Sequence, residues 1–280
     1  MANEEYLKKI KQGVKIWNKW REERIVPYEG RYFNLRNAKL SGIDLEGANL
    51  SRVDFYNSDL SEANLNNADI SEAYLVDSNL NESYLRKANL SNSECSGVHL
   101  FNAFLPEANL NNAKLQFAYL VGADLHCANL RNANLFGANL HKANLRNADL
   151  SNSYLEGTSF VETNLIGTTL NGSNVYGISC WNIKTSEKTN QKNLKVTKGN
   201  EPVITVDNLE VAQFIYLLLN NRKIREVIDT ITSKLVLILG RFAPKRKRVL
   251  DSIKIELRKR NYLPVLFDFE KPAGRDITET

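Results

Sequence analysis

Residues 128–150 decide the fold, because they repeat every five residues: ANLRN ANLFG ANLHK ANLRN ADL. In each repeat a small residue is followed by Asn or Asp and then by Leu. The same register extends in both directions, from Leu35 to Cys180, over 30 positions. Leu occupies 24 of them, and the residue two places earlier is small in 25 of the 30. A repeat of this length takes precedence over any local pattern in predicting the architecture.

A period of five fits neither an α-helix, which repeats about every 3.6 residues, nor a strand, which alternates about every two. A corner after each Leu would restore the phase, so we expect each pentapeptide to form one side of a coil. The small residue and the Leu then point inward, because a narrow interior holds a large side chain only beside a small one. The inward residues include Ala63, Leu65, Ala108, Leu110, Ala128, Leu130, Ala143 and Leu145.

The pattern A(N/D)LXX resembles the pentapeptide-repeat family. Ala63-Asn64-Leu65, Ala108-Asn109-Leu110 and the run from residue 128 to residue 150 carry this resemblance, which covers more than half of the chain. It implies a mainly β fold, a right-handed quadrilateral β-helix with four repeats per coil. Thirty repeats then make about 7.5 coils, stacked over roughly 36 Å at a spacing of ~4.8 Å.

The solenoid is expected over residues 31–182. Its open ends would expose apolar side chains and strand edges, so they need caps. Residues 4–24 show the apolar stripe of an amphipathic helix, and we expect residues 1–30 to form the N-terminal cap. A helix that binds a partner is the alternative. Trp181 is expected to help close the other end.

The sequence changes character after the last repeat. Residues 183–200 are polar and predict a linker. Residues 201–280 predict a small α/β module, in which two apolar strands, 235–240 and 263–267, flank a helix near residues 249–257. This order is that of a βαβ unit with parallel strands, expected to be right-handed.

The segment from Thr205 to Thr280 looks like the C-terminal module of some bacterial pentapeptide-repeat proteins, through Leu209–Asn221, Leu235–Phe242 and Tyr262–Pro272. That module resembles Toll/interleukin-1 receptor (TIR)-like folds. TIR-type enzymes that cleave NAD use a glutamate well downstream of the second strand, and no residue of this chain maps onto it. The resemblance therefore implies a module that is truncated or completed by another chain, and NAD-type binding or cleavage only when it is complete.

Composition indicates a reduced, cytoplasmic protein. The net charge is +5, but it is +2 for residues 1–30, −5 for 31–180 and +8 for 181–280, so the modules suit different partners. The cysteines are three, odd in number and far apart, which predicts neither a disulfide framework nor a metal site. The longest apolar run, Phe214–Leu219, is far shorter than the ~20 residues that span a membrane.

We expect no catalytic site, no metal and no cofactor. The register places the three histidines, His99, His126 and His141, at outward positions without convergent partners. Cys95 and Cys180 occupy Leu positions and are expected to be small core residues, whereas Cys127 points outward. The repeated Asn residues before Leu are expected to bond to nearby backbone at the corners.

Two charged surface features remain. Between residues 41 and 85 nine carboxylates are opposed only by Arg52; some pentapeptide-repeat proteins mimic DNA with an acidic rod and bind DNA gyrase, and ordinary solubilising charge is the alternative. Gly240, Arg241, Lys245 and Arg246 form a candidate anion site, because cations at a helix start oppose the helix dipole unless an anion binds there. A nucleic-acid patch and a solvated basic helix start are the alternatives.

These features favour a non-enzymatic scaffold or protein-interaction protein, a rigid rod that carries a signalling-type module. A DNA-mimic inhibitor of gyrase and a TIR-like, NAD-type module are the alternative functions. We expect polar solenoid sides, with a partner or a second copy of the chain bound through a solenoid end or the C-terminal module.

Overall fold

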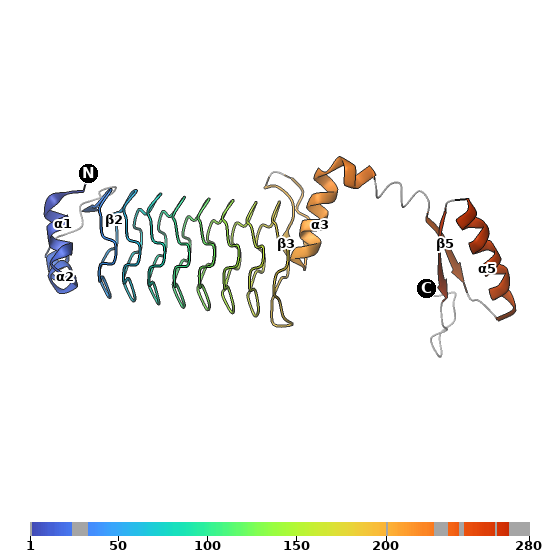
Figure 1. Ribbon diagram of the computed structural model, residues 1–280, viewed down its shortest axis with the longest axis horizontal. Helices are drawn as coiled ribbons and strands as arrows, with labels where there is room; N and C mark the ends of the chain where they lie inside the picture. Colours follow the sequence, from blue (N-terminus) through green and yellow to red (C-terminus); the bar gives the residue numbers. More distant parts are fainter. Residues whose placement is uncertain are drawn as a thin grey trace. The chain divides into compact units, whose positions relative to one another are not determined.

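The computed structural model describes residues 2–23, 33–199, 201–226, 235–240, 244–260 and 262–268. They divide into two compact units, Met1–Tyr216 and Leu217–Thr280. A stack of coils makes up most of the first unit (Figure 1). None of the described helices is long and apolar enough to cross a membrane.

Each coil contains 20 residues and four sides, as the family resemblance implied. β1 (Phe33–Asn34) and β2 (Val53–Asp54) pair in parallel, and single parallel bridges then join residues 20 apart along each side, from Lys39↔Asp59 onward. We name the four faces by their first Leu. Face A begins at Leu35, face B at Leu40, face C at Leu45 and face D at Leu50.

The interior is filled by the two inward residues of each repeat. The eight core residues named from the sequence, from Ala63 to Leu145, are all exposed by 1% or less. Val53 and Val98, which replace the small residue, are equally buried, so the interior accepts a β-branched side chain at single points. Because the coils stack, each Leu packs on the Leu of the next coil, and each burial contributes about 1.5–3 kcal/mol before entropy is subtracted.

The corners require a left-handed backbone. The residue two places after each Leu has a φ between 51° and 59° wherever it is not glycine, as at Asn132 with 56°. Only glycine adopts this region freely, and Asn tolerates it better than other residues. The repeated Asn and Gly at this position therefore follow from corner geometry.

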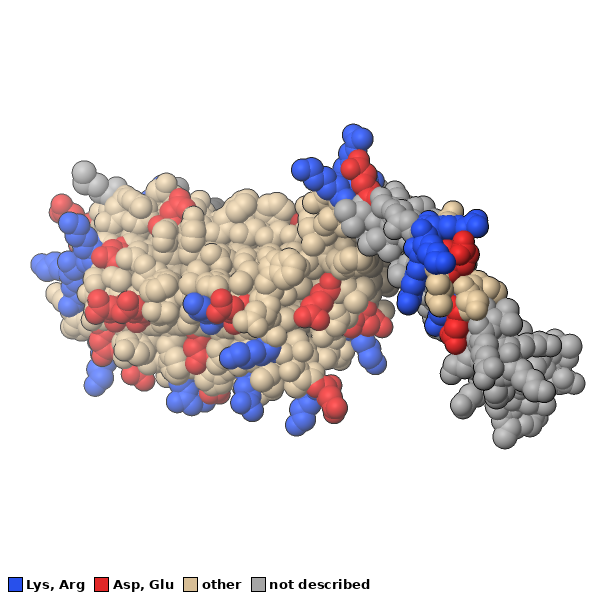
Figure 2. Space-filling view, turned by 45° about the vertical axis from the view of Figure 1, so that its right-hand side comes forward, with Lys and Arg blue, Asp and Glu red and all other residues tan. Residues whose placement is uncertain are grey.

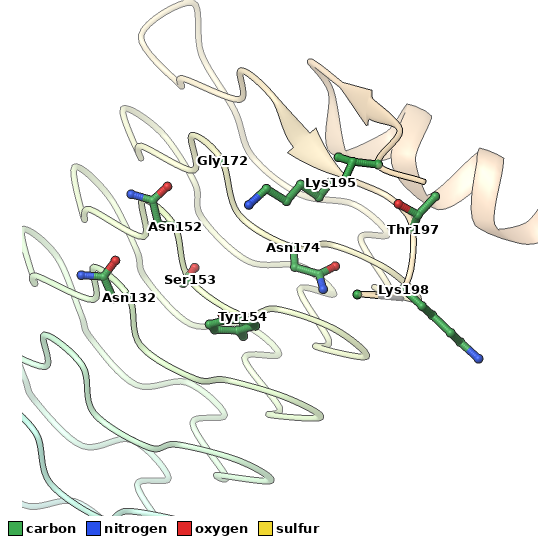
Figure 3. Close-up of a pocket in the computed structure, with 11 residues that line it drawn as sticks. Asn132, Asn152, Ser153, Tyr154, Gly172, Asn174, Lys195, Thr197 and Lys198 are labelled. Atoms are coloured by element: carbon green, nitrogen blue, oxygen red, sulfur yellow. The ribbon is translucent and has the colours of Figure 1, made fainter. Parts of the chain in front are cut away.

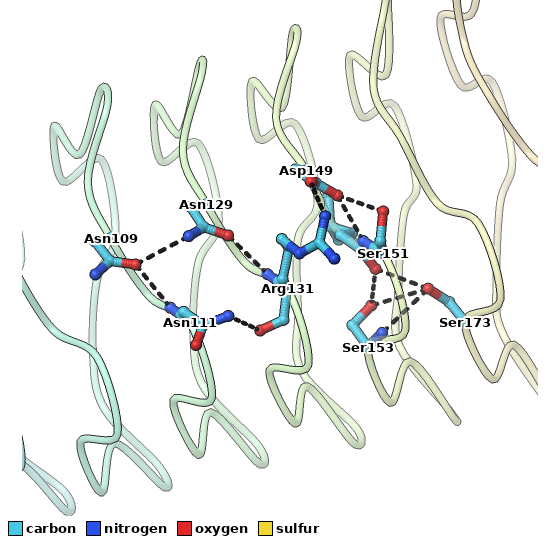
Figure 4. Close-up of polar contacts among 9 residues, drawn as sticks. Asn109, Asn111, Asn129, Arg131, Asp149, Ser151, Ser153 and Ser173 are labelled. Atoms are coloured by element: carbon cyan, nitrogen blue, oxygen red, sulfur yellow. Dashed lines mark hydrogen bonds and ion pairs between the residues drawn. The ribbon is translucent and has the colours of Figure 1, made fainter.

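The predicted bonding of the Asn side chains to the corner backbone is confirmed. Asn109 Oδ1 accepts from the backbone N–H of Asn111 at 3.2 Å (Figure 4). The same bond recurs from Arg131, Phe136, His141 and Arg146 to Asn129, Asn134, Asn139 and Asn144. Each bond satisfies the N–H of the residue directly after Leu, which the backbone bonds between coils leave without a partner. This explains why Asn or Asp precedes Leu.

The same side chains also form ladders from coil to coil. On face D, Asn129 donates to Asn109 at 3.1 Å, Asn109 to Asn89 at 3.0 Å, and Asn89 to Asp69 at 2.9 Å. Face C repeats the order, with Asn164 donating to Asn144 and Asn144 to Asp124. A carboxylate accepts but cannot donate, so Asp69 and Asp124 each form the accepting end of their ladder.

The ladder predicts a directional effect of Asn109→Asp. The new carboxylate keeps the corner bond but cannot donate to Asn89, so two acceptors would face each other. We expect a loss of about 1–2 kcal/mol in urea denaturation at neutral pH. Asn132→Asp is the control, because the Asn132 side chain has no hydrogen bond among the described residues. Equal stability of the two variants would contradict the ladder.

Two helices, not one, lie at the N-terminal end of the stack (Figure 1). α1 runs from Glu4 to Lys11 and α2 from Val14 to Glu22. The expectation of one continuous helix was wrong, because Gly13 takes a φ of 101° between them. Trp17 and Trp20 are buried on the first coil, as the apolar stripe predicted.

Side chains of α2 replace the hydrogen bonds of a missing coil on face D. Trp17 Nε1 donates to the carbonyl of Asn49 at 2.7 Å, and the Asn49 N–H donates to Asn18 Oδ1 at 2.8 Å. Arg21 donates to the carbonyl of Ser51 at 2.7 Å. Within the stack, the same backbone groups bond to the neighbouring coil, as in Leu50 N–H to Asp69 and Asp69 N–H to Ala48. This strand edge is therefore covered by α2.

Residues 183–200 are not a separate linker, in contrast to the prediction. Lys184, Asn190 and Lys195 bridge to Asn164, Thr169 and Asn174, so the solenoid gains three further sides. Leu194 and Val196 continue the buried inner row. β3 (Leu194–Lys195) then pairs in antiparallel fashion with β4 (Thr205–Val206).

The start of α3 (Leu209–Asn220) covers the last full coil. Leu209 and Ala212 are buried, and Gln213 Oε1 accepts from the backbone N–H of Cys180 at 2.5 Å. Trp181 does not close this end as expected, because it is 59% exposed. A polar side chain on a helix thus again completes the edge of the ladder.

The second unit contains the predicted strand–helix–strand order. β5 (Leu235–Gly240) and β6 (Leu263–Asp268) pair in parallel, with Leu235 opposite Leu263, and α5 (Pro244–Lys259) connects them. Parallel strands require such a crossover. The handedness of the crossover and the TIR-like resemblance stay predictions.

Candidate functional site

The histidines do not form a common site. His99 stacks on Tyr119 with ring centroids 4.8 Å apart, His126 Nδ1 lies 3.0 Å from Asp124 Oδ1, and His141 Nδ1 lies 3.0 Å from the carbonyl of Val161. They belong to different coils or faces. The part of the chain that the structure describes contains no group of three or more His, Cys, Asp or Glu arranged to hold a metal.

Two of the three thiols are core groups. Cys95 and Cys180 are buried, as their Leu positions predicted, and Cys127 is exposed at a corner. Burial raises the pKa of both buried thiols to about 12, since a thiolate would lose its hydration there. Neither ionises at neutral pH, so neither is a nucleophile.

The early carboxylates do not align on one face. Two of them pair with arginine: Arg52 with Glu72 at 2.8 Å and Arg36 with Asp54 at 3.7 Å. Figure 2 shows acidic and basic side chains interspersed on the visible side of the coils. By register, face A carries Asp54 and Asp77, face B Asp59, Glu62 and Glu82, face C Asp44 and Glu46, and face D Asp69 and Glu72.

The candidate anion site lies at the end of β5. Gly240 is the last residue of this strand, and Lys245 and Arg246 follow Pro244 in the first turn of α5. Arg241 lies outside the described residues. The anion site at this loop stays a prediction.

Exposed aromatic side chains are the feature that the sequence analysis missed. The sides were expected to be polar, yet Tyr84 is 52% exposed, Phe101 44%, Phe104 37% and Tyr119 50%. Tyr84 and Phe104 are bridged neighbours on face C, and Phe101 precedes Phe104 across the corner from face B. We call Tyr84, His99, Phe101, Phe104 and Tyr119 the central aromatic cluster.

A second group lies on face A. The rings of Phe117 and Phe136 meet edge to face with centroids 5.4 Å apart, and Tyr154 is 58% exposed. Phe117 lies over Gly137, where a Cβ would come within 2.8 Å of its ring. A glycine at this corner of the next coil is therefore what leaves room for the Phe117 ring.

The repeats match the model of a known family. Pentapeptide repeats are matched in eight copies, which run without a gap from residue 34 to residue 178, more than half of the chain. The chain belongs to the pentapeptide-repeat family. Its solenoid is therefore the right-handed quadrilateral β-helix of that family. The matched segments are residues 34–67, 68–105, 93–132, 105–141, 113–152 and 143–178.

Solved pentapeptide-repeat structures are similar to part of the chain. HetL from the cyanobacterium Nostoc sp. strain PCC 7120, involved in heterocyst differentiation regulation, is 24% identical and covers 60% of this chain and 91% of its own, with a TM-score of 0.33. QnrB1, a plasmid-mediated fluoroquinolone resistance protein, is 17% identical over 54% and 93%, also with a TM-score of 0.33. Rfr23 from the cyanobacterium Cyanothece 51142 is 27% identical over 54% and 88%, with a TM-score of 0.25. No curated protein matches the chain.

Proposed function

We propose that this pentapeptide-repeat protein is a non-enzymatic scaffold that binds a protein partner through faces B and C of the solenoid. The observation that carries the proposal is the central aromatic cluster. Tyr and Phe side chains are enriched where proteins bind each other, because they contribute large contact areas. A cluster of exposed aromatic side chains on the outer side of the coils marks a binding surface.

The cluster is also held in place before any partner arrives. The Tyr119 ring stacks on His99, and Phe104 meets His126 edge to face with centroids 6.4 Å apart. The backbone beneath is fixed on both sides by ladder bonds, such as Phe104 N–H to the carbonyl of Ser83. Side chains that are already ordered lose little entropy on binding, so more of the contact energy becomes affinity.

The ends of the solenoid support this choice of surface. α2 hydrogen-bonds the face D edge of the first coil, and Gln213 of α3 hydrogen-bonds the face B edge at Cys180, so these two strand edges are covered. The C-terminal residues would then be a signalling-type module, with NAD-type chemistry only when a TIR-like fold is complete. Binding of a second copy through an end or this module, and a cytoplasmic location, stay predictions.

DNA gyrase is a second candidate partner, favoured by the nine carboxylates between residues 41 and 85. Their spread over four faces gives no continuous acidic stripe. A supercoiling assay with purified gyrase and the full chain tests this function. Inhibition that is lost when Asp59, Glu62 and Glu82 become neutral amides would place gyrase ahead of an aromatic-binding partner.

The aromatic surface is tested by capture from the native cell with a photo-crosslinking amino acid. We expect a crosslinker at residue 101 to capture a discrete partner, and one at Arg131 on face D to capture none. Tyr84→Ser with Phe104→Ser should reduce that capture by about tenfold or more, since aromatic anchors contribute about 2 kcal/mol or more each.

The matched control changes the second aromatic group, Phe117→Ser with Phe136→Ser. It removes the same number of rings from face A, and we expect capture at residue 101 to be unchanged. The four substitutions in these two double variants all replace exposed side chains, so the melting temperatures of both variants should stay near that of the parent chain. Equal loss of capture by both pairs, or capture from residue 131, would contradict the assignment to faces B and C.

A further inference from the structure

A cavity of about 480 Å³ lies where the last coils meet the hairpin of β3 and β4 (Figure 3). Two columns of outward residues form its floor: Asn132 and Asn152 at the corner after face D, and Tyr154, Asn174 and Lys195 on face A. Residues 197–199 of the hairpin form a wall. The volume falls within the ~300–1,000 Å³ of sites for small molecules.

Polar groups in this cavity lack the partners that their columns have elsewhere. In the corner column, Arg52 pairs with Glu72 at 2.8 Å and Asn112 donates to Asn92 at 3.1 Å. Asn132 and Asn152 come next, and neither side chain has a hydrogen bond among the described residues. The break in pairing coincides with the cavity, which leaves amide donors and acceptors for a ligand.

The face A column shows the same break. Lys114 pairs with Glu94 one coil below it, whereas no described carboxylate lies within 4 Å of the Lys195 ammonium. In Figure 3 the Lys195 side chain extends back along the solenoid toward Asn152. Lys198 also belongs to the lining, but Figure 3 shows its side chain extending away from Lys195, and its ammonium lies 5.4 Å from the ring centroid of Tyr176. Lys195 is therefore the cation that faces the cavity, and because the lining contains no carboxylate, the cavity suits an anion.

Tyr154 provides a flat apolar surface in the same cavity. Its ring is 58% exposed, and its backbone is held by a 2.9 Å bond from its N–H to the carbonyl of Ala133. Asn174, the next residue in the column, accepts from the N–H of Tyr176 through Oδ1, and its Nδ2 donates to no described group. An exposed ring beside free amide donors is the arrangement that binds a planar heterocycle.

We propose that this cavity binds a small anion that carries a planar ring, such as a nucleoside monophosphate. The anionic group would lie at Lys195, the ring would stack on Tyr154, and the amides of Asn152 and Asn174 would bond to its polar edge. The site belongs to the solenoid and its hairpin. Its residues belong neither to the central aromatic cluster nor to the basic segment that follows β5.

NMR titration of the ¹⁵N-labelled full chain tests the proposal, with the side-chain amide signals of Asn132, Asn152 and Asn174 as local probes. AMP and phenyl phosphate are the test ligands; adenosine, which lacks the phosphate, and inorganic phosphate, which lacks the ring, are the controls. We expect at least one test ligand to shift these signals and to bind about tenfold or more tightly than adenosine or inorganic phosphate, because stacking and charge both contribute. Binding of AMP but not of phenyl phosphate would indicate a nucleotide site. Binding of phenyl phosphate as well would indicate a site for simple aromatic anions.

Lys195→Gln and Tyr154→Leu should each weaken binding by about fivefold or more. Lys184→Gln and Tyr119→Leu are the matched controls, since they change an exposed Lys of the same last coil and an exposed Tyr of another face. Lys245→Glu with Arg246→Glu should leave the three amide signals unaffected. The proposal is overturned if neither ligand shifts the signals at about 10 mM, or if the Lys195 and Tyr154 variants bind as the parent does.

Discussion

Leu130→Lys is expected to unfold the coils around residue 130, whereas Phe101→Lys is expected to leave the solenoid folded. Leu130 is 1% exposed and lies in the continuous inner row, so a lysine there would bury an unpaired charge. That burial costs several kcal/mol, in addition to about 2–5 kcal/mol for the lost Leu packing. The sum is comparable with the whole stability of a typical domain, about 5–15 kcal/mol.

Phe101 is the matched control, because the same charge replaces a large apolar side chain that is 44% exposed. Its lysine would remain hydrated, and we expect a change within about 0.5 kcal/mol. Circular dichroism during heating measures the thermal unfolding of both variants, Leu130→Lys and Phe101→Lys. A solenoid is stabilised by contacts between neighbouring coils, so Leu130→Lys could open the stack from one point outward. Equal melting curves would refute the inward and outward assignment.

Most of the solenoid could be predicted because every repeat obeys the same local constraints. Leu110 is inward, Asn109 bonds to the corner after it and to Asn89, and Asn112 takes the left-handed corner position. Each of these roles depends on a residue's place within five, and the sequence shows that place directly. A periodic sequence therefore specifies burial and turns throughout, without knowledge of the tertiary structure.

The ends could not be predicted in the same way. Thr185 and Gln191 stand where Leu would be in the last coil, and six residues separate them where five would continue the register. Because both the residue type and the spacing fail, these sides look like a polar linker. Likewise, the bonds from Trp17 to Asn49 and from Cys180 to Gln213 join distant segments, and no local pattern predicts such partners.

The surface sites fall between these two cases. The register shows that Tyr84, Phe101 and Phe104 point outward, but only the 20-residue coil shows that two of them are neighbours on one face. For the cavity, Tyr154 and Asn174 share a column that the repeat predicts. Lys195 joins them only because the solenoid continues past residue 183, and the hairpin wall follows from that continuation.

Removal of residues 2–23 is expected to make the chain self-associate through its first coil. Trp17, Asn18 and Arg21 hydrogen-bond the backbone of residues 49 and 51, and Trp20 covers Phe33 with ring centroids 5.8 Å apart. Without α1 and α2, this strand edge and its apolar coil would be exposed. An unpaired edge is a template for pairing with another chain, so we expect dimers or larger species in light scattering.

Arg21 allows the same prediction to be tested without a deletion. Its side chain is buried, stands 3.8 Å from the Phe33 ring centroid, and donates to Ser51 and Asn49. Burial lowers its pKa to about 10; Asp69 opposes this shift and Arg52 adds to it, and the residue stays charged at neutral pH. Arg21→Met keeps much of the apolar stem but leaves the Ser51 carbonyl without its bond. We expect the free energy of unfolding to fall by about 1.5–3 kcal/mol and the chain to self-associate slowly.

Lys19→Met, on the exposed side of α2, is the control and should change neither the stability nor the association state. If the Arg21 variant and the deletion both stay monomeric and as stable as the parent chain, the edge is not what these helices protect.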